Sequence, residues 1–148
     1  MSKLVPFETT LHVHDTCLCL RAQRAARALA RHFDEALRPA GLTNQQFSLL
    51  MALNRPDPPS MAPVADLLSM DRTTLTAALK PLERRGLVRI EPSLIDRRTR
   101  LLVLTETGSE ALAAAVPIWR DTHAAIDGRL AAGDLETPRD ALDLLARI

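Results

Sequence analysis

Apolar residues recur every three or four positions in two long segments, one near each end of the chain. This spacing gathers them on one face of a helix, so it predicts helices over residues 15–37 and from residue 105 past residue 130. Together the two segments carry more apolar surface than a small central unit can cover, which favours a homodimer. The first stripe comprises Leu18, Ala22, Ala25, Leu29, Phe33 and Leu37, and the second comprises Leu112, Val116, Trp119, His123, Ile126 and Leu130.

Composition excludes several classes of protein. The 148 residues are 47% hydrophobic and 25% charged, the balance of one globular chain. Aromatic residues make up 3% and tyrosine is absent, so helix formers dominate. No apolar run is long enough to span a membrane, and the N-terminus lacks the apolar core of a secretory signal. We therefore expect a cytoplasmic protein without membrane contact, and Cys17 and Cys19 alone do not form a disulfide framework.

Start and stop signals divide the segment after the first helix. Pro39 and Gly41 should end that helix, and Thr43 with Gln46 fits a capping box that begins the next. The proline-rich residues 55–60 predict a loop. A short helix over residues 63–69 would follow, with Pro63 at its first position.

A further helix is predicted over residues 72–85. Asp71 suits its N-cap and Gly86 its C-terminal end, while Pro81 should kink it. Its inward face would carry Leu75, Leu79 and Leu82.

Two short strands and two helices complete the predicted order. The strands cover residues 87–91 and 100–105 and are joined by residues 92–99. Thr105 would cap the long helix, Pro117 would bend it, and Thr137 would begin the last helix.

Basic charge is concentrated in one block. Residues 72–100 carry 8 basic and 3 acidic side chains, net +5, whereas the whole chain has a net charge of +1. Such a block is expected where a polyanion docks, although it is also compatible with a solvated basic face.

Four segments in this order resemble the multiple-antibiotic-resistance-type (MarR) regulators. They are GLTNQQFSLL at 41–50, MDRTTLT at 70–76, LERRGLV at 82–88 and DRRTRLLVLTETG at 96–108. The last is the most specific, since it is similar to the family's wing motif. The chain departs from the family's pattern at Pro81, and at Ser69 and Met70, where a glycine is common.

The resemblance implies a mainly α winged helix-turn-helix fold with long dimerisation helices at both ends and a small β-hairpin wing. Residues 1–40 would form an N-terminal arm and dimerisation helix, residues 41–108 the DNA-binding lobe, and residues 109–148 the C-terminal dimerisation helices. The protein would bind a pseudo-palindromic operator as a homodimer, in the role of a repressor. A small-molecule ligand would release the protein from double-stranded DNA, and an aromatic compound is one candidate for this ligand.

The same resemblance assigns the DNA contacts. The outward face of the helix at 72–85 would enter the major groove, where short polar side chains and a long cation read base edges. Its residues are Arg72, Thr73, Thr76, Ala77 and Lys80, with Thr74 assisting the cap or a phosphate. On the wing, Asp96 should pair with one arginine and leave the other of Arg97 and Arg98 free to enter the minor groove.

The effector site is less constrained by the sequence. Trp119 on the long helix could line a pocket for an aromatic ligand, although such a residue often only packs. A thiol-based redox repressor is the alternative, in which Arg21 or a helix N-terminus stabilises the thiolate of Cys17 or Cys19. Cys17 and Arg21 join Trp119 as candidate ligand residues on this reasoning. The peroxide-sensing branch of the family also uses tyrosines, which this chain lacks.

Other function classes find little support. No glycine-rich phosphate loop, Ser–His–Asp order or pair of catalytic acids is present, so we expect no enzyme and no cofactor. His12 and His14 lack further clustered ligands, so we also expect no metal site.

Overall fold

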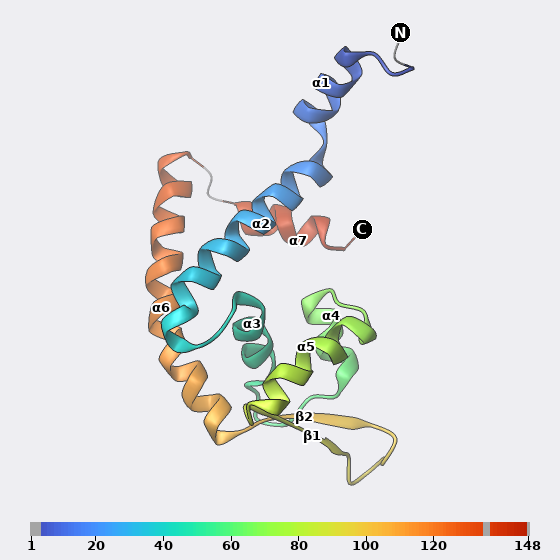
Figure 1. Ribbon diagram of the computed structural model, residues 1–148, viewed down its shortest axis with the longest axis vertical. Helices are drawn as coiled ribbons and strands as arrows, with labels where there is room; N and C mark the ends of the chain where they lie inside the picture. The colour runs from blue at the N-terminus through green and yellow to red at the C-terminus, as the bar shows by residue number, and fades with distance from the viewer. Residues whose placement is uncertain (1–3, 135–136, 148) are drawn as a thin grey trace. The chain divides into compact units, whose positions relative to one another are not determined.

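The structure is a computed structural model that describes residues 4–134 and 137–147, and it divides into two compact units between His32 and Phe33. The described residues are mainly helical and contain one two-stranded antiparallel sheet (Figure 1). The predicted fold class is confirmed. None of the helices among these residues is long and apolar enough to cross a membrane.

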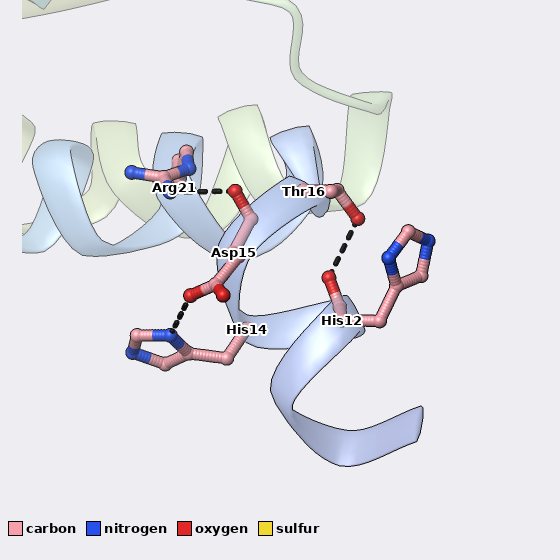
Figure 2. A network of polar contacts seen from close by, with 5 residues as sticks. All are labelled: His12, His14, Asp15, Thr16 and Arg21. Atoms are coloured by element: carbon pink, nitrogen blue, oxygen red, sulfur yellow. Dashed lines mark hydrogen bonds and ion pairs between the residues drawn. The ribbon is translucent and has the colours of Figure 1, made fainter. Parts of the chain in front are cut away.

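The first unit contains α1 (Phe7–Thr16) and most of α2 (Leu18–Leu37). The prediction of one helix starting at residue 15 is wrong, because Cys17 leaves the helical region with φ −70° and ψ 109°. In an unbroken helix the carbonyl of Asp15 would accept from the N–H of Cys19. Instead it accepts from Nη2 of Arg21 at 2.7 Å (Figure 2), so a side chain stabilises the break.

The apolar stripe of α2 is buried only at its end. Phe33 and Leu37 lie in the core of the second unit, whereas Leu18 is 63% and Leu29 42% exposed. On α2, four arginines and two alanines line a shallow groove: Arg21, Arg24, Arg27, Arg31, Ala25 and Ala28. The first unit thus presents an apolar stripe flanked by positive charge.

The second unit begins with three short helices: α3 (Asn44–Leu53), α4 (Met61–Leu68) and α5 (Arg72–Arg84). The capping box at Thr43 and Gln46 is confirmed, with the side chain of each residue accepting from the backbone N–H of the other. Asp34 accepts from the backbone and side-chain N–H groups of Asn44, which lowers the pKa of its carboxyl. Pro63 is the third residue of α4, not the first, because Ser60 already occupies the N-cap position.

A core of leucines holds these helices together. The side chains of α5 predicted to face inward, Leu75, Leu79 and Leu82, are fully buried. They share this core with Leu49 and Leu50 of α3. Burial of these three leucines therefore determines which face of α5 is left exposed to solvent.

The hairpin consists of β1 (Val88–Pro92) and β2 (Arg100–Leu104), within one residue of the predicted ranges. Val88 pairs with Leu104 at its base and Pro92 with Arg100 near its tip. The loop before α4 adds a further backbone contact, because the N–H of Leu102 donates to the carbonyl of Pro59 at 2.8 Å. This anchors the middle of β2 to the loop before α4, and the far end of the hairpin extends past α5 (Figure 1).

Two helices follow the hairpin: α6 (Glu106–Ala132) and α7 (Pro138–Leu145). Thr105 caps α6 as predicted, accepting from the N–H of Gly108. The helix continues through Pro117. In α7, no described residue is buried, and Leu142 and Leu144 are 55% and 70% exposed. Both ends of the chain therefore present apolar side chains that a single copy leaves in water.

Candidate nucleic-acid interface

The N-terminus of α5 is fixed by a side-chain cap. Asp71 Oδ1 accepts from the backbone N–H of Thr74 at 2.7 Å. This bond, followed by one from the Thr74 side chain, holds the pKa of Asp71 below its usual value. Thr74 thus takes part in the cap through its backbone N–H. The carboxylate stays ionised at neutral pH, where it also interacts favourably with the positive end of the helix dipole.

The turn before this cap requires a left-handed backbone. Ser69 adopts φ 50° and ψ 42°, the region that glycine enters without strain. The N–H of Met70 donates to the carbonyl of Ala65 at 2.9 Å and closes the end of α4. Ser69 therefore takes the place that glycine commonly has in the family, and the C-cap of α4 still closes.

The outward face of α5 is open to solvent. Every residue of this helix that we assigned to DNA is exposed: Arg72, Thr73, Thr74, Thr76, Ala77 and Lys80. The hydroxyl of Thr76 donates to the carbonyl of Arg72 at 2.8 Å. Its proton is thereby engaged, and Thr76 can offer a partner only its oxygen lone pairs and its methyl group. Pro81 lies inside the helix, which continues to Arg84.

The loop of the hairpin is closed by its own hydrogen bonds. The N–H of Ser93 donates to the carbonyl of Thr99 at 2.8 Å, and the N–H of Thr99 donates to the carbonyl of Asp96 at 2.9 Å. The N–H of Ile95 donates to Ser93 Oγ at 3.2 Å. These bonds define the shape of the tip that carries the exposed side chains of Arg97 and Arg98.

The expected ion pair of Asp96 with an arginine does not form among the described residues. Asp96 Oδ1 accepts from the backbone N–H of Arg98 at 3.0 Å, and Oδ2 accepts from the Thr99 hydroxyl at 3.4 Å. Backbone donors two or three residues along reach a short carboxylate more easily than a flexible guanidinium does. Asp96 thus shapes the turn, and both Arg97 and Arg98 remain available to a partner.

The candidate effector residues lie in different surroundings. Cys17 is half-buried and Cys19 is exposed. Cys17 Sγ accepts from the N–H of Leu20 at 3.4 Å, at the start of α2. The guanidinium of Arg21 is hydrogen-bonded to Asp15 and not to either sulfur. The proposed contact between Arg21 and a thiolate is therefore not formed.

Trp119 belongs to a run of ring contacts in the second unit. Its ring stacks on Phe47 of α3 with centroids 6.0 Å apart and lies 4.7 Å from His123, whose ring is 5.3 Å from Phe33. Trp119 is 36% exposed, so one part of the ring packs and another meets solvent.

Sequence reasoning missed the residue that joins α7 to this run. Arg139 Nη2 is 3.3 Å from His123 Nδ1 and donates to Asp127 Oδ1 at 2.7 Å. His123 and Asp127 are four residues apart on α6, a spacing that places them on one face and was visible in the sequence. No pattern in the sequence indicated that Arg139 of α7 would contact these two residues.

The histidines near the N-terminus do not assemble a metal site. Figure 2 shows the rings of His12 and His14 directed to different sides of α1, with His14 Nδ1 2.8 Å from Asp15 Oδ1. Within the described residues no three His, Cys, Asp or Glu side chains are grouped to hold a metal ion.

Comparison with known proteins places this arrangement in a family. The sequence model of the MarR family matches residues 40–99 of this chain, and this range includes every residue that we expect to contact DNA. The M. tuberculosis transcriptional regulator MosR, solved in complex with DNA, is 38% identical, with a TM-score of 0.79 over 89% of this chain and 95% of MosR. The chain belongs to the MarR family. It is a winged-helix DNA-binding transcriptional regulator and not an enzyme, as the sequence predicted.

Curated relatives differ in the direction of regulation. The transcriptional repressor NicR of Pseudomonas putida is 32% identical over 111 residues, 73% of this chain and 70% of NicR. The transcriptional activatory protein BadR of Rhodopseudomonas palustris is 36% identical over 94 residues, 62% of this chain but only 54% of BadR. Membership of the MarR family therefore leaves the sign of regulation to be assigned.

Proposed function

We propose that this MarR-family protein is a homodimeric repressor that binds a pseudo-palindromic operator and is released by a small aromatic ligand. The observation that carries the proposal is the outward face of α5, exposed and free of acidic residues from Arg72 to Lys80, beside a wing that presents Arg97 and Arg98. Thr73, Ala77 and Lys80 follow one another at helical spacing and suit the major groove. The repressor role follows NicR, which the chain matches over more of its length than BadR.

The homodimer is supported by exposed apolar surface on the terminal helices. Leu18 and Leu29 of α2 and Leu142 and Leu144 of α7 remain in water in a single copy. A two-fold dimer would bury such side chains and present two α5 helices to two half-sites of an operator.

Removal of residues 138–148 tests this arrangement. We expect the truncated protein to dimerise more weakly and to lose operator affinity with it, because each lobe alone contacts only one half-site. Sedimentation equilibrium and fluorescence anisotropy on a duplex selected by the full chain from a randomised library measure the two effects. A truncated protein that remains a tight dimer at nanomolar concentration would refute the assignment of α7 to the dimer interface.

The aromatic ligand is supported by Trp119. A half-exposed indole beside His123 and above Phe47 offers a stacking surface between α6 and the α3 helix of the DNA-binding lobe. A ligand stacked there would contact both elements. A thermal-shift screen of small aromatic acids, followed by quenching of the single tryptophan, identifies such a ligand; the proposal fails if hits release DNA equally from Trp119→Leu.

The redox alternative is favoured by one contact. Cys17 Sγ accepts from the backbone N–H of Leu20 at 3.4 Å, so this sulfur lies at the start of α2. Since the chain lacks tyrosine partners, we expect Cys17→Ser and Cys19→Ser to keep DNA binding and ligand release. If peroxide releases the wild type from DNA and either serine variant resists, the protein is a thiol sensor instead.

A further inference from the structure

The tip of the wing carries two fully exposed aliphatic side chains. Leu94 is 102% and Ile95 99% exposed, the most exposed pair of neighbouring large hydrophobic residues among those described. They directly precede Asp96, Arg97 and Arg98, so apolar and cationic side chains share one narrow loop. A pair of aliphatic side chains held in water suggests a partner that removes them from it.

The shape of the loop is set independently of these two side chains. The backbone N–H of Ile95 is engaged by Ser93 Oγ, and the N–H groups of Arg98 and Thr99 are engaged by Asp96. Leu94 and Ile95 therefore contribute no packing to the folded chain. Replacing them should leave the fold intact and remove only what they give a partner.

The charge around the tip selects the class of partner. The two acidic side chains of the wing are engaged locally: Asp96 by backbone and hydroxyl donors, and Glu91 by Arg89 Nε at 2.8 Å. The guanidinium groups of Arg97 and Arg98 make no ion pair with any described residue. A second copy of this tip would repel the first. A partner surface that combines closely spaced negative charges with apolar walls would complement the tip better than a second copy of it would.

We infer that Leu94 and Ile95 enter the DNA minor groove and pack against its deoxyribose walls, while Arg97 and Arg98 meet the phosphates on either side. The groove is about 6 Å wide, too narrow for a helix but open to side chains of a hairpin tip. Leucine and isoleucine are among the residues that proteins insert there. This inference rests on the proposed operator binding and adds an apolar component to what is otherwise a cationic wing.

Salt dependence separates the two components. An arginine that neutralises a phosphate releases counterions, so its loss reduces the slope of log affinity against log salt by about one unit. An apolar contact releases none. The double variant Leu94→Ser, Ile95→Ser should bind a wild-type-selected duplex about tenfold or more weakly with an unchanged slope, given the aliphatic area removed from water. Arg98→Ala should reduce both affinity and slope.

The matched control is Met51→Ser, which removes an apolar side chain that is 43% exposed on α3, outside α5 and the wing. It should bind like the wild type. Hydroxyl-radical cleavage, which attacks the sugars from the minor groove, locates the contact. Wild-type protein should protect the sugars at the two ends of its footprint, and the double variant should lose that protection while keeping the centre of each half-site.

Each contrary result is specific. Equal affinity and equal end protection in the double variant would overturn the inference, and so would a slope change like that of Arg98→Ala. If the double variant kept its DNA affinity but lost self-association, the partner of the tip would be a second copy of the chain. If it kept its DNA affinity but lost binding to vesicles of anionic lipid, the partner would be a membrane surface. Failure of the wild type to select any duplex would instead refute the proposed function.

Discussion

Gly108→Ala should destabilise the protein by about 3 kcal/mol, near the upper end of what overpacking usually costs. A Cβ at this position would lie 2.8 Å from Leu104 Cδ1 and even closer to the backbone carbonyl oxygen of Leu87. The leucine side chain can move aside, but the carbonyl cannot, because it accepts from the N–H of Thr105 at 3.1 Å. The strain would therefore fall on the junction of β1, β2 and the start of α6.

The matched control lies on the same helix. Apart from its chain neighbours and the backbone of its own helix, Gly128 has no described atom within 4 Å of an added Cβ, so Gly128→Ala should stabilise α6 by about 0.5–1 kcal/mol through helix propensity alone. Urea denaturation of both variants measures the difference. A Gly108→Ala protein as stable as the wild type would mean that the wing base can shift freely, contrary to its anchored hydrogen bonds.

Loss of Gly108 should also affect the wing. Thr105 Oγ1 lies 2.7 Å from the Gly86 carbonyl and accepts from the N–H of Gly108, so one residue ties the end of α5, the hairpin and α6 together. Operator affinity of Gly108→Ala should fall at temperatures well below its unfolding midpoint, because the wing base loses its fixed geometry before the core opens.

Features decided by local physics were predictable from the sequence. The caps at Thr43, Asp71 and Thr105 each depend on a side chain and a backbone donor three residues away, and all three form. The same holds for the buried face of α5, since helical spacing alone places Leu75 and Leu79 together. The two strands of the hairpin were likewise predicted from their own residues, and the family resemblance of residues 96–108 added only that this hairpin is a wing.

Features decided by competition between contacts were not predictable. No proline or glycine marks the break at Cys17, where the Arg21 side chain donates to the Asp15 carbonyl. An acid beside two arginines suggested an ion pair, yet Asp96 accepts from its own turn. The stacking of Trp119 on Phe47 joins residues far apart in the sequence, and no periodic pattern encodes such a pairing.

Substitutions on α5 and on the wing should weaken DNA binding in different ways. Lys80→Ala should cost roughly 1–3 kcal/mol on the selected operator and much less on random DNA, as expected for a side chain that contacts bases. Thr76→Val should cost less than Lys80→Ala, because the Thr76 hydroxyl already donates to the Arg72 carbonyl and the valine keeps the methyl. Both effects concern discrimination between sequences.

Arg97→Ala and Arg98→Ala should instead weaken operator and random duplexes alike, because phosphate and minor-groove contacts are tolerant of sequence. Each should reduce the salt slope by about one unit. Asp96→Ala leaves both arginines in place but removes the acceptors of the turn that presents them. Asp96→Ala should therefore lower affinity for both duplexes, but it should reduce the slope of log affinity against log salt by less than either arginine substitution does.

Fluorescence anisotropy of each variant on the two duplexes, at several salt concentrations, measures both quantities together. Arg120→Ala is the matched control, since this exposed arginine belongs to α6 and to neither α5 nor the hairpin, and its loss should change neither affinity nor slope. If Arg98→Ala left affinity and slope unchanged, the wing would not contact DNA. The positive charge of residues 72–100 would then act through α5 alone, and the wing arginines would be a solvated surface.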